Sequence, residues 1–194
     1  MNDLFKQPDD ATPLTPEEMR ELIPTHIAYR HELNEAEQEN ISRAQDWALN
    51  RRRDPLSEKF VKDLHRRMFG DVWRWAGKFR MSERNLGIVF HEIPVALRQL
   101  LDDTRGWIEY RTYPPDEIAV CFHHRLVLIH PFANGNGRHA RLMADLLVMR
   151  LGGERFSWGS TNLQDAGAVR QRYIAALQAA DDHDIGPLLA FARS

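Results

Sequence analysis

The sequence has a single cysteine, no long apolar run and almost no net charge, and each absence excludes a class of protein. With Cys121 alone among 194 residues, the chain can form neither an internal disulfide nor a cysteine-based zinc cluster. No apolar run is long enough to cross a bilayer, and the acidic, polar first residues are unlike a signal or transit peptide. A net charge of −2 gives no general attraction to nucleic acids or anionic membranes. We therefore expect a cytoplasmic protein that binds neither nucleic acid nor membrane.

Helical periodicity covers most of the chain. Thr15, Pro16 and Glu18 form the pattern of a helix start with a capping box. Residues 116–129, "DEIAVCFHHRLVLI", are apolar on nearly every face, which is typical of a helix at the centre of a core. We predict an all-α fold, a helical bundle around a central helix pair, in one compact domain. An N-terminal helical region over 1–54 precedes a core with the C-terminal helices over 55–194.

One stretch breaks the helical pattern. Residues 77–94, "GKFRMSERNLGIVFHEIP", have no helical period and contain two glycines, with short β-leaning pieces at Lys78–Met81 and Gly87–His91. We expect a small β-hairpin flap with a polar tip here.

Residues 130–141, "HPFANGNGRHAR", carry the strongest chemical signal. Gly135 and Gly137 can adopt backbone angles that turn successive N–H groups into one anion-binding concavity. If a helix begins near Gly137, its N-terminus also favours phosphate, and the Asn136 amide can donate to the same phosphate. Arg138 and Arg141 are three residues apart, so both project from one face of the first turns and can hold outer phosphates. The pattern predicts a nucleotide phosphate site.

His130 and Phe132 complete the predicted site. Transfer of a phosphoryl or nucleotidyl group to a hydroxyl requires removal of a proton near neutral pH, for which an imidazole is suited. His130 is therefore the candidate base, and Phe132 is expected to anchor the loop in the core.

A dinucleotide-binding turn is the rival interpretation. The run from Gly135 to Ala140 reads G-x-G-x-x-A, and Glu154 lies near the distance expected for a ribose-binding acid. That fold alternates strands and helices, whereas this chain is helical almost throughout, so the turn after a helix is favoured.

The string His-Pro-Phe-x-x-Gly-Asn-Gly-Arg-x-x-Arg resembles the signature of the Fic (filamentation induced by cAMP) family. The sequence supplies every fixed position of it: His130, Pro131, Phe132, Gly135, Asn136, Gly137, Arg138 and Arg141. The likeness extends over about residues 55–152, and the N-terminal half looks most like small members described as mobile mystery protein B.

The resemblance implies a helical protein adenylyltransferase that moves AMP from ATP to a Ser, Thr or Tyr hydroxyl of a target protein. By this likeness His130 is the base, and Gly135, Asn136 and Gly137 hold the α-phosphate. Arg138 and Arg141 then hold the β- and γ-phosphates. The likeness also implies a flap that docks the target by main-chain pairing. Its residues would be Lys78, Phe79, Arg80, Gly87 and Ile88.

Position 134 departs from the family pattern. AMP-transferring members commonly have Asp or Glu there to hold Mg²⁺, and this chain has Asn134. An amide oxygen can ligate Mg²⁺ or Mn²⁺ but carries no charge, so we expect weak metal binding with the ATP phosphates supplying most ligands.

Family members often carry an inhibitory helix with Ser/Thr-x-x-x-Glu-Gly/Asn, whose Glu pairs with the second motif arginine. Here Glu39-Asn40 matches the end of that pattern, while Glu35 occupies the Ser/Thr place. The resemblance therefore implies that Glu39 pairs with Arg141, although a charged helix can contain Glu-Asn without any such role.

Two other functions remain open from the residues alone. One is a transferase that uses another nucleotide or phosphate donor, because no residue of the motif reads a base. The other is a nucleotide-binding regulatory protein with little catalysis, which would act with a regulatory or antitoxin-like partner. Among neighbouring side chains, His139 is expected to face solvent, and Asp145 either orients Arg141 or lies on the surface.

Overall fold

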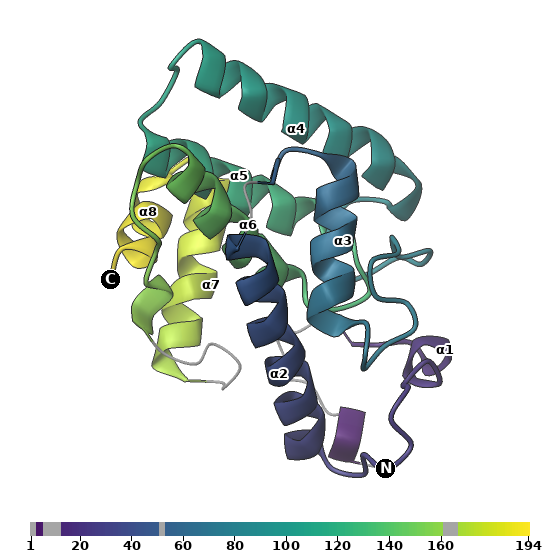
Figure 1. Ribbon diagram of the computed structural model, residues 1–194. Coiled ribbons are helices and arrows are strands. Elements are labelled where there is room, and N and C mark those ends of the chain that lie inside the picture. Colours follow the sequence, from purple (N-terminus) through teal and green to yellow (C-terminus); the bar gives the residue numbers. More distant parts are fainter. Residues whose placement is uncertain (1–2, 6–12, 51–52, 161–166) are drawn as a thin grey trace.

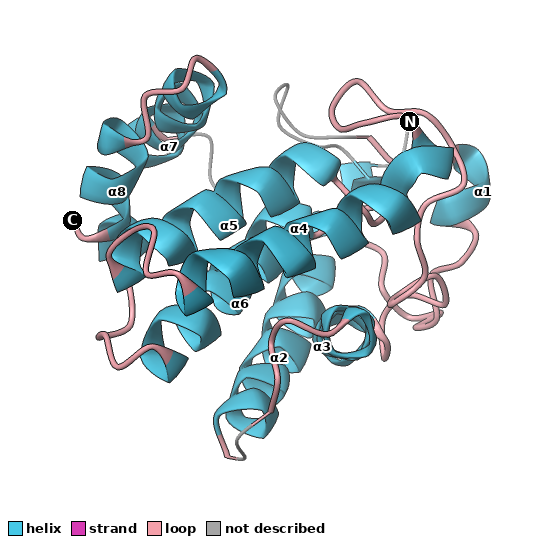
Figure 2. Cartoon of the chain, turned by 90° about the horizontal axis from the view of Figure 1, so that it is seen from above, coloured by secondary structure: helices cyan, strands magenta, loops and turns pink. Residues whose placement is uncertain are grey.

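A computed structural model describes residues 3–5, 13–50, 53–160 and 167–194. These residues form helices and connecting loops, and the predicted all-α class is confirmed (Figure 2). The helices are η1 (Asp3–Phe5), α1 (Pro16–Met19), α2 (Arg30–Leu49), α3 (Glu58–Phe69), η2 (Phe90–Glu92), α4 (Ile93–Glu109), α5 (Pro115–Ile129), α6 (Asn136–Arg150), η3 (Trp158–Ser160), α7 (Ala168–Asp181) and α8 (Gly186–Ala192).

Helices α5 and α6 form the centre of the bundle, as the sequence predicted. Helix α5 packs against α6, α4 and α8, and α6 also contacts α3 and α2 (Figure 1). The apolar character of α5 explains this place, because Ile118, Phe122 and Leu126 are all buried. The loop that joins α5 to α6 contains the motif, so it is held by the best-packed pair in the molecule.

Side-chain caps start the helices where the sequence placed them. The Thr15 hydroxyl accepts from the Glu18 N–H at 3.3 Å, and the Glu18 carboxylate accepts from the Thr15 N–H at 2.9 Å. This reciprocal pair is the predicted capping box. Ser57 likewise accepts from the Phe60 N–H at the start of α3.

The prediction of a hairpin within residues 77–94 is wrong. Among the described residues, the pairing of β type is an isolated antiparallel bridge between Leu22 and Trp73, outside this segment. The segment instead folds around Arg80, whose guanidinium donates to the carbonyls of Ser82 and Ile88. Because one side chain satisfies these carbonyls, the backbone does not need a strand ladder.

The N-terminal helices are joined to the rest of the chain by polar and apolar contacts. Helix α2 packs along α3, and the carboxylate of Glu37 accepts from the Trp73 indole N–H at 2.7 Å. The division of the domain at residue 54 stays a prediction.

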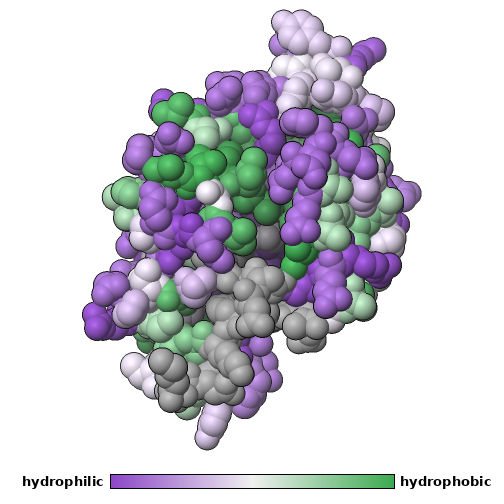
Figure 3. All heavy atoms as spheres, turned by 180° about the vertical axis from the view of Figure 1, so that it is seen from behind, coloured by the Kyte–Doolittle hydropathy of each residue, from purple (hydrophilic) through white to green (hydrophobic). Residues whose placement is uncertain are grey.

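The face turned away from the view of Figure 1 mixes hydrophilic and apolar side chains (Figure 3). In the described part of the chain, none of the helices combines the length and apolarity that a membrane span requires.

Candidate active site

Two left-handed residues shape the loop between α5 and α6. His130 ends α5 with a φ of 52°, and Gly135 precedes α6 with a φ of 77°. A Cβ at Gly135 would lie 2.4 Å from the Phe69 ring, so both the backbone angle and the space require glycine. Helix α6 begins at Asn136, one residue before the predicted start, and the first N–H groups of the helix, which have no partner within it, follow the glycine directly.

Asn136 fixes the loop from inside. Its Oδ1 accepts from the Phe132 N–H at 2.9 Å, and its Nδ2 donates to the Phe132 carbonyl at 2.8 Å. The side chain is 3% exposed, so it does not point toward a phosphate as the sequence suggested. Phe132 is fully buried, which fits an anchor. Asn136 and Phe132 therefore shape the loop, and the N–H groups at the start of α6 are the part of it suited to an anion.

His130 is a neutral imidazole at pH 7. Its pKa is lowered to about 4, chiefly by burial and then by the nearby Arg80 guanidinium, while a backbone hydrogen bond at Val127 acts in the opposite direction. The side chain is 9% exposed. A Cβ at Gly87 would lie 2.5 Å from the His130 Cβ, so the 78–91 segment packs directly on this residue.

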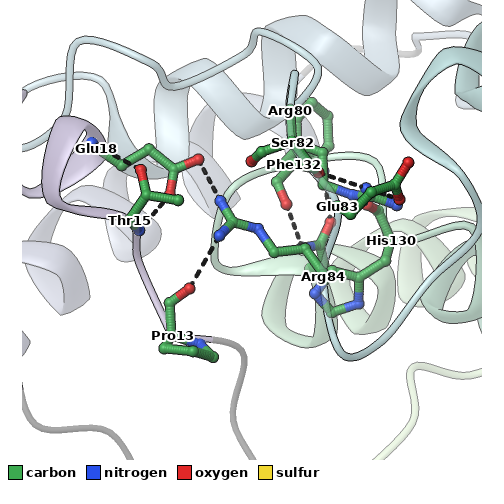
Figure 4. A network of polar contacts seen from close by, with 10 residues as sticks. Pro13, Thr15, Glu18, Arg80, Ser82, Glu83, Arg84, His130 and Phe132 are labelled. Carbon is green, nitrogen blue, oxygen red and sulfur yellow. Dashed lines mark hydrogen bonds and ion pairs between the residues drawn. The ribbon is translucent and has the colours of Figure 1, made fainter.

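Arg80 ties the 78–91 segment to the motif loop. Its Nε donates to the His130 carbonyl at 2.7 Å, and its backbone N–H donates to the Pro131 carbonyl at 2.9 Å (Figure 4). Its side chain is fully buried. Arg80 is thus unavailable to dock a target, which corrects the role expected for it. The other four predicted flap residues are exposed or partly exposed: Lys78, Phe79, Gly87 and Ile88.

Arg84, in the same 78–91 segment, bonds the N-terminal residues Pro13 and Glu18. The Arg84 guanidinium pairs with the Glu18 carboxylate and donates to the Pro13 carbonyl at 3.1 Å (Figure 4). Arg84 also contributes to the low pKa of His130. The sequence offered no pattern that would pair residues so far apart.

The side chains of the two motif arginines on α6, Arg138 and Arg141, contact different partners. Arg138 pairs with the Glu37 carboxylate at 2.6 Å, and its Nη2 donates to the Asn134 Oδ1 at 3.3 Å. Arg141 is hydrogen bonded to the Tyr173 hydroxyl, and burial lowers the pKa of its guanidinium. A buried guanidinium bonded to a hydroxyl keeps its charge available for an anion.

The acidic partner of the motif is Glu37 rather than Glu39. Glu37 is 5% exposed and forms an ion pair with Arg138. Glu39 lies on the exposed face of α2. Arg141 is instead hydrogen bonded to Tyr173. The predicted pairing of Glu39 with Arg141 is therefore corrected. A helical spacing could have found Glu37, because the buried residues of α2 recur every three or four positions: Leu33, Glu37, Asn40, Ala44 and Ala48.

Asn134 is the residue of this loop that was expected to hold a metal ion. Among the described residues, no group of three His, Cys, Asp or Glu side chains is placed to hold one. The chain offers the Asn134 amide oxygen, which accepts from Arg138. Such a donor fits an ion that takes most of its ligands from phosphate and water.

Two expectations about neighbouring side chains were wrong. His139 is fully buried and bonds the Val61 carbonyl through Nε2 at 3.0 Å, so it does not face solvent. Asp145 is also buried, and it accepts from Arg155 and from the Trp158 indole at 2.8 Å each rather than orienting Arg141.

Comparison with known proteins identifies the fold and the motif. A model of the "Fic/DOC family" matches residues 55–148, which include the whole loop and most of α6. The chain is a Fic domain protein. Protein adenylyltransferase fic-1 of Caenorhabditis elegans and protein adenylyltransferase Fic of Aedes aegypti are each 31% identical over 147 residues. The alignments cover 74% of this chain, which spans 28% of the length of either relative. The likeness to mobile mystery protein B stays a prediction.

Solved structures share the fold of this Fic domain. Fic-1 of C. elegans (residues 134–508) superposes with a TM-score of 0.61 at 26% identity, over 79% of this chain and 46% of that one. BepC of Bartonella tribocorum, solved with bound AMPPNP, superposes with a TM-score of 0.66 at 18% identity, over 92% of this chain and 97% of that one. The second likeness supports the fold alone.

Proposed function

We propose that this Fic domain transfers AMP from ATP to a hydroxyl group of a target protein. The observation that carries the proposal is the loop itself. A neutral, buried histidine begins the loop, a glycine with positive φ ends it at the N-terminus of α6, and two arginines follow on that helix. The relatives named protein adenylyltransferase, at 31% identity, support the same reaction.

Each part of the loop has one task in this reaction. The N–H groups that begin at Gly135 bind the α-phosphate, and Arg138 and Arg141 hold the two outer phosphates. The target hydroxyl oxygen attacks the α-phosphorus, and the bond to the leaving pyrophosphate breaks. His130 takes the hydroxyl proton, because its imidazole is neutral at pH 7.

Mg²⁺ or Mn²⁺ is proposed to enter with the nucleotide. The ion would neutralise charge on the phosphates, and this chain would contribute the Asn134 amide oxygen. Because that oxygen is uncharged, binding of the ion depends chiefly on the phosphates. The exposed residues Lys78 and Gly87 and the partly exposed residues Phe79 and Ile88 belong to the segment that would hold the target, and this segment packs on His130 at Gly87.

Radiolabelled ATP distinguishes this reaction from its alternatives. Incubation with cell lysate and Mg²⁺ or Mn²⁺ should transfer label from α-³²P-ATP and none from γ-³²P-ATP, because pyrophosphate leaves. Label from γ-³²P-ATP, or transfer from other nucleotides alone, would contradict AMP transfer and favour another donor. Nucleotide binding without any transfer would instead favour a regulatory protein.

We further propose that Glu37 restrains this activity by occupying Arg138. Its carboxylate lies 2.6 Å from the guanidinium, where a terminal phosphate of ATP would otherwise bind. The pair is largely buried, at 18% and 6% exposure of the two side chains, so the competition is between two well-formed charge-assisted bonds.

Glu37→Gln should raise ATP affinity and AMP transfer by about tenfold, since a hydrogen bond to a charged group contributes ~1.5–3 kcal/mol. The glutamine amide oxygen still accepts from the Trp73 indole, so the helix packing is kept. Glu39→Gln is the matched control, because Glu39 lies on the exposed face of the same helix. Calorimetric titration with ATP and the α-³²P assay measure both effects. A Glu37→Gln protein that binds ATP no better than Glu39→Gln would show that Glu37 orients Arg138 rather than blocking it.

A further inference from the structure

His65 on α3 is a buried titratable group that the proposed reaction does not use. Its side chain is fully buried, and its ring stacks on Phe132 with centroids 3.7 Å apart and planes 21° from parallel. It lies between the motif loop and the turn at Gly77, where the 78–91 segment begins. One side chain therefore contacts both parts of the candidate site.

The two hydrogen bonds of His65 fix its protonation. The Gly77 N–H donates to Nδ1 at 3.0 Å, and because a backbone N–H can only donate, Nδ1 carries a lone pair. The ring proton is then on Nε2, which donates to the Asn134 carbonyl at 3.0 Å. Burial holds the pKa of His65 well below its usual value, so the ring stays neutral. The other tautomer, or the imidazolium, would break one of the two bonds.

The Asn134 carbonyl belongs to the same peptide unit as the Gly135 N–H. In a planar trans peptide these two groups point in opposite directions, and the described residues, which include 134 and 135, contain no cis peptide. When His65 holds the carbonyl toward the core, the Gly135 N–H must point away from it. Gly135 is also the residue with positive φ that precedes α6. The direction of this N–H thus depends on the His65 bond.

We propose that His65 is a positioning residue for phosphate binding, which orients the Asn134–Gly135 peptide so that the Gly135 N–H faces the nucleotide. The inference rests on the proposed function, because the phosphate concerned is that of the transferred nucleotide. If the peptide turned over, a carbonyl oxygen would face the phosphate in place of a donor, and binding would be repelled rather than favoured. Through Gly77, the same ring also fixes the start of the segment that lies on His130.

Two substitutions separate the two bonds. In His65→Gln the side-chain amide nitrogen reaches the former Nε2 position and can donate to the Asn134 carbonyl. In His65→Asn the shorter amide places its oxygen at the former Nδ1 position, where it accepts from Gly77 and leaves the carbonyl without a donor. Both variants lose one bond and the stacked ring, so their stabilities should fall by similar amounts.

The expected result is an ATP affinity and an AMP-transfer rate about tenfold lower in His65→Asn than in His65→Gln. Leu188→Ala is the control for a loss of stability alone, since Leu188 is fully buried in α8, outside the motif loop. Calorimetric titration with ATP, the α-³²P assay and urea unfolding would be measured on the full chain. Equal losses in the two His65 variants, or losses that follow stability as in Leu188→Ala, would overturn the inference.

Backbone amide resonances test His65 without any activity. The Gly135 and Gly137 amide signals should move in His65→Asn relative to wild type and stay near their places in His65→Gln. Unmoved Gly135 signals in His65→Asn would reject the positioning role. Absence of label transfer by the wild-type chain, with Gly135 shifting as expected, would reject AMP transfer and leave the role of His65 in place.

Discussion

Replacing His130 by Ala should lower AMP transfer by about 10²–10⁴-fold, because the target hydroxyl loses the base that accepts its proton. ATP binding should change little, since the Gly135 N–H and the two arginines remain. The α-³²P assay and calorimetric titration measure the two quantities separately. His26→Ala is the matched control, because His26 is exposed in the loop before α2. A His130→Ala protein that keeps more than about a tenth of the activity would exclude His130 as the base.

The pH dependence of transfer gives a second test of the same role. With a pKa of about 4, His130 is neutral at pH 8 and at pH 6, so wild-type transfer should not fall between these values on its account. A histidine of ordinary pKa would be half protonated near pH 6.5. Loss of half the activity at that pH, with the protein still folded, would contradict the environment described for His130.

The residues of the loop were largely predictable because their constraints are local. Gly135 must take a positive φ to turn the chain into α6, and a run of two glycines around an asparagine predicts this directly. The orientation of Asn136 was not predictable, because an amide can bond a ligand or its own loop. The structure uses it for the loop, through both its oxygen and its nitrogen.

The residues that contact the motif loop from other parts of the chain are set by long-range packing, so they were harder to predict from the sequence than the loop itself. Glu37 and Glu39 are two residues apart, so a helix places them on nearly opposite sides, and only the packing of α2 on α3 decides which faces the motif. His65 is hydrogen bonded to Gly77, which is 12 positions away in the sequence, and to Asn134, which is 69 positions away. Arg80 was assigned to a flap from its position in the sequence, but its burial beneath that segment depends on where the motif loop lies.

Acidification from pH 6.5 to pH 5 should remove a large part of the folding stability. Four histidines are buried with lowered pKa values: His65, and His123, His130 and His139 at about 3, 4 and 3. In the unfolded chain each has a pKa near 6.5, so below that pH the unfolded state binds more protons than the folded state and the free energy of unfolding falls. The slope for each histidine is half its full value at pH 6.5 and approaches about 1.4 kcal/mol per pH unit below pH 5.5, so each histidine contributes a loss of about 1.6 kcal/mol between pH 6.5 and 5. Total stabilities of small domains are about 5–15 kcal/mol, so unfolding within this range is expected.

Urea unfolding at half-unit steps of pH measures this dependence. The carboxylates with lowered pKa values, Asp63 and Glu32, contribute mainly at lower pH, since their ordinary values are 3.8 and 4.5. The raised pKa of Asp145 acts in the opposite sense, because its folded form binds a proton more readily than its unfolded form. His139→Asn should reduce the slope by the share of one histidine. A stability that is constant from pH 7 to pH 5 would mean that these rings are protonated in the folded state, and the neutral donor and acceptor roles assigned to His65 and His130 would then fail with it.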